Sequence, residues 1–510
     1  MKFSPMIRQR IGNPDTDVHN WGLRDGTYSG DFRASELNHD EDFQVDCIQT
    51  ATLGSSIIPS PINFEKKFNS SIVDPKQDLA VLVEDEQEGS KFARFHFHSL
   101  TTGQPHPLAE HPILTVSFDD GFLHQNNLSD EPMTAHPEIM GKYFVVKIYW
   151  PESDFEVSEI LLWDWRTAIL LARIYIEHSS ARSTFLDKSH LLVYSTLPEN
   201  GHQSTRIALL IYRIPNAAAS QEVPPNADFR TSLYPKHNPI LVFEFPELHP
   251  SWTITGQQFM LYSAPLPGDV VYSKSATFLC SRINTLGIDF RIWNNPTRQF
   301  YVYGSHKGTP TDFHVFVKTH YLFEHLLAHQ PEGLTTHIIP WSEWGANATR
   351  WFIEDGSIEH ISAEVHESRY IRSTITKTET QLLSIVDFNT PTIKRHAYIS
   401  TAKSRTKRVS ADIAEKTAVL EGRGLIEGRL FQTRISSSKL PIPTIGQVLN
   451  PEVVTETIGS DMKTVILKGF KNPVISCLPY RVVTKVQRMP LHGHWRIHGE
   501  YLVGVVSLAY

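Results

Sequence analysis

Apolar and polar residues alternate along this chain in short runs, and turn residues separate the runs. In Ile72–Glu84 (IVDPKQDLAVLVE), an Asp-Pro turn precedes a run of branched apolar residues. Phe92–Leu100 (FARFHFHSL) has a period of two and is followed by the Thr-Thr-Gly turn of residues 101–103. Runs of this length and period are typical of β-strands joined by tight turns.

The same pattern continues to about residue 390. Further predicted strands are Tyr143–Trp150, Val157–Trp165, Ala168–Ile176, Arg206–Ile214, Ile240–Phe245, Tyr301–Tyr303, Phe313–Val317 and Leu382–Phe388. Phe185–Tyr194 (FLDKSHLLVY) again shows an Asp, a polar turn and an apolar strand. The clearest turns are about 50 to 100 residues apart, whereas one four-stranded blade of a β-propeller needs about 40 to 50 residues. The longer gaps predict insertions or a degenerate unit between the repeats.

This pattern predicts an all-β fold, because strands follow one another with no regular helix between them. Closed repetition of antiparallel sheets leaves only short edges exposed. We therefore expect residues 61–510 to form a WD-like β-propeller of six or seven antiparallel blades. Two or three separate β-sandwiches are the alternative, but no linker interrupts residues 70–390. The last strand, Tyr501–Val506, is expected to help close the ring beside an early segment.

Residues 1–60 differ from the rest, because they are polar, rich in Asp, Asn and Gly, and hold only three leucines. They predict an irregular N-terminal arm with at most one short strand. One or two short helices are expected elsewhere. Thr319–His329 places apolar residues on one stripe before a Pro-Glu-Gly stop, and residues 404–421 are the second candidate.

Composition narrows the class of protein. The 48 basic and 55 acidic residues give a net charge of −7, which argues against a protein built mainly to bind nucleic acid or an anionic membrane. The three cysteines lie far apart with no CxxC pair, which argues against a zinc knuckle or a disulfide framework. No secretory signal and no membrane-spanning apolar run is present. The expected location is intracellular, in the cytoplasm or nucleus.

Four stretches of the chain resemble a known family. They are VDPKQDLAVLVE with the later SLTTGQPHPLA, ILLWDWRTAILL with STFLDKSHLLVYS, IIPWSEWGANATRWF (Ile338–Phe352) and ISCLPYRVV (Ile475–Val483). Together they resemble the mushroom-type basidiomycete F-box proteins, whose C-terminal part is predicted to be a WD-like propeller. The resemblance runs from about residue 65 to the C-terminus and is most specific in the last two stretches.

The chain departs from that family at its N-terminal end. Family members begin with an F-box, a leucine-rich helical module that presents an apolar face to a Skp-type adaptor. Residues 1–60 show neither the leucines nor the Leu-Pro start of that module. The family's link to ubiquitin-ligase subunits is therefore not carried over to this chain. Loss of the module and an upstream exon that encodes it are the two explanations.

The predicted partner-binding surface is a set of loops that carry aromatic residues. Three tryptophans and one arginine fall within eleven residues, and one further tryptophan lies upstream: Trp341, Trp344, Arg350, Trp351 and Trp293. Exposed aromatic and arginine side chains are typical anchors for a protein partner. The alternative is that the cluster packs between two blades.

Three other groups have a simpler explanation. Trp163, Asp164 and Trp165 end an apolar strand, and the two tryptophans share a face, so packing between blades with the Asp capping the turn is favoured. His96 and His98 also share a face, but no third ligand accompanies them, so satisfied or solvated histidines are favoured over zinc. His325 and His329 have the spacing of a metalloprotease motif that lacks its glutamate.

The chain has one strong run of basic residues. Its six cations are Lys394, Arg395, Lys403, Arg405, Lys407 and Arg408, with no acid among them. A nuclear-import or phosphate-binding segment is one interpretation. A solvated loop between two blades is favoured, because the whole chain is acidic.

No nucleophile elbow, phosphate-binding loop or dinucleotide fingerprint is present. We therefore expect a non-catalytic module that binds a protein partner, with no cofactor and no metal. In the F-box family this would be the substrate-recognition part of a ubiquitin-ligase adaptor. The alternative is a hydrolase or lyase that uses acids in the propeller channel. Two or more carboxyl groups with a His or Arg in one concave pocket would favour that alternative.

Overall fold

The computed structural model describes twenty segments of the chain, and the statements below concern these segments. They are residues 18–33, 44–84, 91–128, 131–150, 157–176, 180–199, 201–215, 223–264, 266–267, 270–272, 277–279, 285–294, 310–329, 335–354, 360–361, 365–375, 381–394, 454–486, 494–499 and 501–505.

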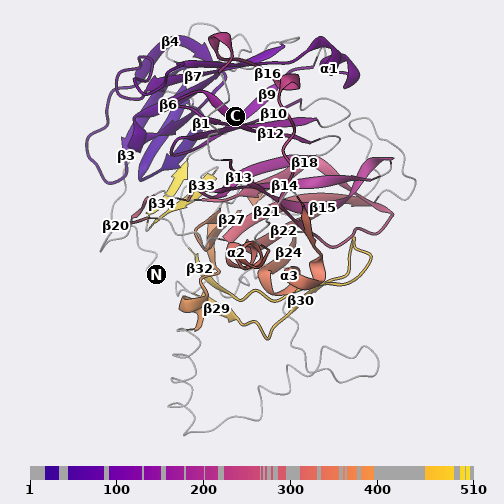
Figure 1. The fold of residues 1–510 in the computed structure, drawn as a ribbon. Coiled ribbons are helices and arrows are strands. Elements are labelled where there is room, and N and C mark those ends of the chain that lie inside the picture. The colour runs from indigo at the N-terminus through magenta and orange to yellow at the C-terminus, as the bar shows by residue number, and fades with distance from the viewer. Residues whose placement is uncertain are drawn as a thin grey trace, which may run out of the picture.

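Three antiparallel sheets come first in the chain (Figure 1). Sheet 1 contains β1 (Val18–Arg24), β2 (Thr27–Phe32), β3 (Val45–Thr52) and β4 (Ile62–Phe68). Sheet 2 contains β5 (Ser70–Asp74), β6 (Leu79–Glu84), β7 (Phe92–Ser99) and β8 (Ile113–Ser117), with β16 (Asp228–Arg230) added in parallel. Sheet 3 contains β9 (Thr134–Met140), β10 (Tyr143–Tyr149), β11 (Ser158–Asp164) and β12 (Ile169–Ile176).

Three more sheets follow. Sheet 4 contains β13 (Ala181–Asp187), β14 (His190–Glu199), β15 (Gly201–Arg213), β17 (Leu241–Glu244) and, in parallel, β23 (His337–Ile339). Sheet 5 contains β18 (Trp252–Tyr262), β21 (Thr285–Asn294), β22 (Thr311–Lys318) and β24 (Thr349–Glu354). Sheet 6 contains β25 (His360–Ile361), β26 (Val365–His366), β27 (Arg369–Ile375), β28 (Gln381–Asp387), β32 (Tyr480–Val486) and β29 (Val454–Ile458).

The remaining elements are short. Three hairpins are formed by β19 (Val270–Tyr272) with β20 (Thr277–Leu279), β30 (Thr464–Ile466) with β31 (Val474–Ser476), and β33 (His494–His498) with β34 (Tyr501–Val505). The α-helices of the described segments are α1 (Asp120–Gln125), α2 (Thr319–Ala328) and α3 (Trp341–Ala348). The 3₁₀ turns are Pro75–Gln77, Pro225–Ala227 and Thr231–Leu233.

The sheets follow one another around a ring, so the predicted all-β, WD-like propeller is confirmed. The first strand of a sheet contacts the first strand of the next, as β1 does with β5 and β5 with β9. The hairpin β33–β34 lies between sheet 6 and sheet 1 (Figure 1). Trp495 and Ile497 pack against sheet 6, and the Arg496 guanidinium lies 4.0 Å from the centre of the Trp21 ring in β1. Six sheets and this hairpin therefore make up the ring, and the expected role of the last strand is met by the hairpin.

Insertions from later sheets reach back to earlier ones. β16 follows sheet 4's β15 in the chain but pairs with β8 of sheet 2. β23 follows β22 of sheet 5 but pairs with β17 of sheet 4. The β30–β31 hairpin of the sheet 6 region packs against α3 and β24. These three insertions explain the long gaps between the sequence repeats.

The expectation of an irregular arm over residues 1–60 is wrong for the described part of it, because β1, β2 and β3 form most of sheet 1. The strands were missed because their buried faces are weakly apolar. In β2 (TYSGDF), five consecutive residues are buried although only Tyr28 and Phe32 are large and apolar. Partners distant in the sequence contact this sheet: Ser71 of sheet 2 bonds Asp31 of β2, and Arg496 of the final hairpin lies over Trp21 of β1.

Most predicted strands are confirmed, since β7, β10, β11, β12, β17, β22 and β28 lie within a residue or two of the expected ranges. The helix expected at Thr319–His329 is confirmed as α2. Residues 301–303 and 404–421 lie outside the described segments. Within those segments, no helix combines the length and apolar character that a bilayer crossing requires.

Candidate functional site: a cavity at the centre of the ring

The predicted tryptophan cluster is mostly internal. Trp344 on α3 is 2% exposed, and Trp351 on β24 is fully buried. The Trp351 ring contacts the rings of Phe290, Phe313 and Phe470 at centroid distances of 5.8, 5.9 and 5.3 Å. Because they are buried, these two tryptophans are not part of a binding surface. They pack between sheets, which was the alternative interpretation of the cluster.

Arg350 is also fully buried, and its hydrogen bonds connect distant segments. Its guanidinium donates hydrogen bonds to the Leu478 carbonyl at 2.6 Å, the Met462 carbonyl at 3.0 Å and Thr464 Oγ1 at 2.9 Å. Burial lowers the pKa of the guanidinium, which nevertheless stays protonated because an arginine pKa is so high. Arg350 thus joins β24 to the C-terminal segment and is not available to a partner.

Two predicted binding residues keep part of their surface. Trp341, the first residue of α3, is half-buried and packs on Trp344 and Trp351 at 5.2 and 5.7 Å. Trp293 is half-buried near the end of β21. In the basic run, Lys394 is exposed, whereas the other five predicted cations lie outside the described segments.

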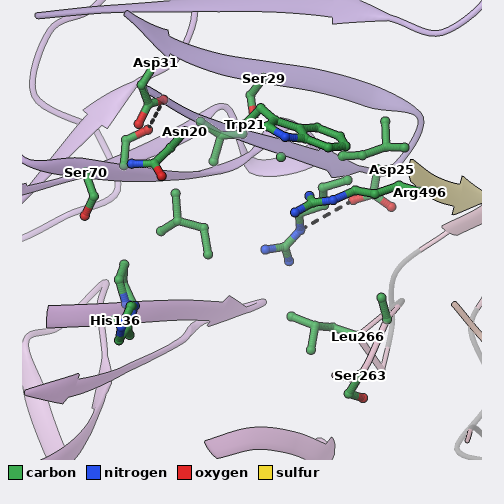
Figure 2. A pocket seen from close by; sticks show the side chains of 18 of the residues that line it. Asn20, Trp21, Asp25, Ser29, Asp31, Ser70, His136, Ser263, Leu266 and Arg496 are labelled. Carbon is green, nitrogen blue, oxygen red and sulfur yellow. Dashed lines mark hydrogen bonds and ion pairs between the residues drawn. The ribbon is translucent and has the colours of Figure 1, made fainter. Parts of the chain in front are cut away.

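A cavity of about 670 Å³ lies where the first strands of sheets 1, 2 and 3 meet the final hairpin. Its walls are formed by β1, β2, β5, β9, β26 and β33, together with Ser263, Ala264 and Leu266 after β18. Figure 2 shows polar side chains directed into it from several of these elements, and none of the predicted binding residues lines it.

Two charged side chains of the wall, Arg24 and Asp25, are held in ion pairs. Four of the lining residues carry a formal charge, two arginines and two aspartates: Arg24, Arg496, Asp25 and Asp31. Arg24 Nη2 lies 3.0 Å from Asp74 Oδ2 behind the wall, and Lys76 Nζ lies 2.8 Å from Asp25 Oδ1. With its histidines neutral, the wall has no net charge when Asp31 is ionised and one net positive charge when Asp31 is protonated.

Asp31 has an unusual environment for a carboxyl group. It is 3% exposed, and burial raises its pKa to about 7, although the hydrogen bond from Ser71 Oγ at 2.7 Å opposes the rise. The group is therefore partly protonated near neutral pH. Since Asp31 lies on β2 and Ser71 on β5, the bond joins sheets 1 and 2.

Two neighbouring histidines also line the cavity. His366 on β26 is 4% exposed and His498 on β33 is 3% exposed, with their ring centres 5.2 Å apart. Burial lowers the pKa of both, and for His366 the shift is large, so its imidazole is neutral at physiological pH. Neither ring nitrogen of His366 has a hydrogen-bond partner among the described residues. A buried polar group in that state costs about 1–3 kcal/mol unless something else satisfies it.

The cavity has the composition that would favour an enzyme, since two carboxyl groups, arginines and histidines line it. Its geometry does not bring the carboxyl groups together. Asp25 lies in the β1–β2 turn and Asp31 near the far end of β2, so roughly 13 Å of strand separates them. Figure 2 shows them on opposite sides of Trp21. Glycosidase pairs act at about 5–9.5 Å, and Asp25 is already held in ion pairs.

The other predicted chemical groups have structural roles. Trp163 and Trp165 are fully buried between sheets 2 and 3, and Asp164 accepts a hydrogen bond from the Arg166 amide in the turn, as expected. His96 Nε2 lies 2.9 Å from Glu84 Oε2, and His98 Nδ1 lies 2.8 Å from a backbone carbonyl.

His325 and His329 stack on each other beside α2, at a centroid distance of 5.9 Å. In the described part of the chain, no three His, Cys, Asp or Glu side chains gather closely enough to hold a metal ion.

Sequence reasoning missed the residues that form the cavity. Trp21, Arg24 and Asp25 lie in the segment expected to be irregular, and His366 lies in a two-residue strand. His498 lies near the C-terminus, far along the chain from both of these segments. No local signal could have joined it to β1 or β26, because the contact exists only after the ring closes.

Comparisons with known proteins give little further information. No protein-family model matches the chain, and no curated protein matches it. Among solved structures, the chain is similar to the WD40 domain of SCAP from fission yeast, over 92% of this chain and 96% of that chain. The identity is 8% and the TM-score 0.28, so the likeness is too distant to support a statement about this chain.

Proposed function

We propose that this protein is a non-catalytic module that binds a protein partner. The observation that carries the proposal is a group of exposed apolar side chains around the buried tryptophan cluster. Leu327 on α2 is 71% exposed, Ile338 on β23 is 60% exposed, and Leu467 after β30 is 71% exposed. We call these three residues, with the half-buried Trp341, the rim surface.

The elements that carry the rim surface adjoin one another. His329 at the end of α2 contacts His337 of β23, with ring centres 5.6 Å apart. The Cys477 amide donates a hydrogen bond to the Ala346 carbonyl, which joins α3 to the segment after β31. In Figure 1, α2, α3 and β30 lie together on one side of the molecule. Exposed apolar side chains held on rigid elements favour recognition of another protein.

A catalytic role is not proposed, because the two carboxyl groups of the central cavity are separated along β2, and one of them, Asp25, is held in an ion pair with Lys76. The finer assignment, a substrate-recognition part of an F-box-type adaptor, rests on the sequence resemblance alone. It implies that the partner is a protein destined for ubiquitination. The rim surface would then hold that protein.

Proximity labelling followed by pull-down with the full chain tests the proposal. A protein recovered in this way must then bind the purified chain saturably. Leu327→Asp combined with Ile338→Asp should weaken that binding at least tenfold, because both changes place charge at an apolar contact. Leu233→Asp is the matched control, since Leu233 is 74% exposed on a different insertion. If no recovered protein binds saturably, the proposal fails.

A further inference from the structure

The central cavity contains a hydrogen-bonding group that the protein itself leaves unsatisfied. His366 lines the cavity and is only 4% exposed. Neither of its ring nitrogens has a hydrogen-bond partner among the described residues. Buried imidazoles are normally hydrogen-bonded, so an unsatisfied one that borders a cavity indicates a group bound within that cavity. This observation is independent of the rim surface.

The size of the cavity fits a small molecule. Its volume of about 670 Å³ falls within the range of roughly 300–1,000 Å³ that small-molecule sites occupy. The lining combines apolar side chains with polar ones, as such sites do. The uncharged polar groups include Asn20, Ser70, Thr134 and Ser263, which come from four separate parts of the ring.

Charge limits the class of ligand. Each charged side chain of the wall already has a partner: Arg24 and Asp25 are held in ion pairs, the Arg496 guanidinium lies over the Trp21 ring, and Asp31 accepts a hydrogen bond from Ser71. A charged ligand would have to compete with these contacts, which is unfavourable in a buried setting. The neutral imidazole of His366 offers one donor and one acceptor. A ligand hydroxyl group can complement both.

We propose that the central cavity binds an uncharged, hydroxyl-rich small molecule of about the size of a mono- or disaccharide, with His366 as a hydrogen-bonding anchor. The amide and hydroxyl side chains of β1, β5, β9 and the segment after β18 would bond its remaining hydroxyl groups. The apolar side chains of the wall, such as Ile72 and Leu266, would contact its carbon faces.

Ligand-observed NMR with the full chain tests this proposal, using glucose, myo-inositol, maltose and cellobiose as probes. At least one of these should bind saturably at millimolar concentration or below. Glucosamine and glucuronate, which add one positive or one negative charge to the same ring, should bind at least tenfold more weakly than glucose. Absence of saturable binding by all four neutral probes overturns the proposal, as does equal binding of the charged analogues.

Two variants locate the binding site. His366→Phe keeps the ring but removes both nitrogens, and should weaken binding about tenfold. His124→Phe is the control, because His124 is exposed on α1 outside the cavity lining. Thr134→Trp places a large side chain in the wall and should abolish binding. This second variant tests the site independently if the His366 variant does not fold. Unchanged binding in the folded Thr134 variant would place the ligand elsewhere and overturn the proposal.

Discussion

Two tryptophan clusters hold this molecule together in different ways. Trp163 and Trp165 lie between sheets 2 and 3, which are consecutive in the chain, and pack on rings such as Phe144 and Phe97. Trp351 packs on residues of sheets 4 and 5 and on Phe470, which is more than a hundred residues away. We call them the local cluster and the distant cluster.

The difference between them distinguishes residues that stabilise the fold from residues proposed to bind a partner. The local cluster joins neighbours that the chain order already places together. The distant cluster brings α3, β24 and the β30–β31 hairpin together, and the buried charge of Arg350 fixes their arrangement. Aromatic residues in the distant cluster were predicted to bind a partner, but their burial makes them a support for the exposed residues around them.

The largest predicted effect is the loss of a buried tryptophan. Trp351→Ala and Trp163→Ala should each lower the free energy of unfolding by about 3–5 kcal/mol, because each leaves a large cavity. The comparison predicts that only Trp351→Ala also loosens residues 454–486. Denaturant unfolding measures the first effect and amide hydrogen exchange the second. Equal protection of residues 454–486 in both variants would remove the distinction between the clusters.

Arg350→Met should cost about 2–4 kcal/mol, because three acceptors of the C-terminal segment lose their donor in a buried site. Arg350→Lys should not restore stability, since an ammonium cannot reproduce the forked geometry of the guanidinium. Asp164→Asn in the local cluster is the matched control and should cost about 1 kcal/mol, because its Lys142 partner is largely in water. Chemical denaturation measures all three.

Sheets 1 and 2 are joined by a polar contact, the hydrogen bond between Ser71 and Asp31, in place of an aromatic cluster. Asp31 has a pKa raised to about 7 from 3.8, so the folded state binds the proton more tightly than the unfolded state. Its contribution to stability is therefore fully present below pH 3.8 and is lost as the pH rises through about 7. Asp31→Asn should then be more stable than wild type at pH 8, by about 2–3 kcal/mol, and similar to it at pH 4.

Asp74→Asn tests the sign of this effect at pH 8. It removes a carboxylate that is ion-paired with Arg24, so it should destabilise the protein where Asp31→Asn stabilises it. Thermal unfolding of both variants at pH 4 and pH 8 measures the difference. A destabilising Asp31→Asn at pH 8 would mean that the Asp31 carboxylate is stabilised by its surroundings.

The smallest effect on stability is expected at the rim surface. Leu327→Asp alone should change the free energy of unfolding by less than about 0.5 kcal/mol, because the side chain is already largely in water. It should still weaken binding of a partner. Leu233→Asp should change neither quantity. A Leu327 variant that unfolds the protein would show that this residue supports the distant cluster and is not a contact for a partner.

Much of the fold is readable from local pattern. Period-two alternation located β7, β10 and β11, and the shared face of Trp163 and Trp165 correctly indicated packing between sheets. The stripe of Leu322 and Leu326 located α2. In each case, the residues that define the element are also the ones that its neighbours bury.

The local sequence pattern did not predict burial where that burial depends on residues distant in the chain. Sheet 1 was missed because β2 buries small and polar residues under segments from sheet 2 and the C-terminus. Trp344 and Trp351 were assigned to a loop surface because nothing near them in the sequence shows that Phe470 and Val474 return to the same core cluster. The rim residues Leu327 and Ile338 gave no signal, since single exposed apolar residues are common.

The sequence by itself determined the class of this protein, a ring of antiparallel sheets with turns at polar, Pro and Gly positions, because strand pairing and alternation are local properties. Only the tertiary structure decided which side chains are buried, exposed or directed into a shared cavity. His366, Arg24 and Arg496 come from three distant segments, and ring closure alone places them around one space. Function depends on such placements, and no local pattern of residues encodes them.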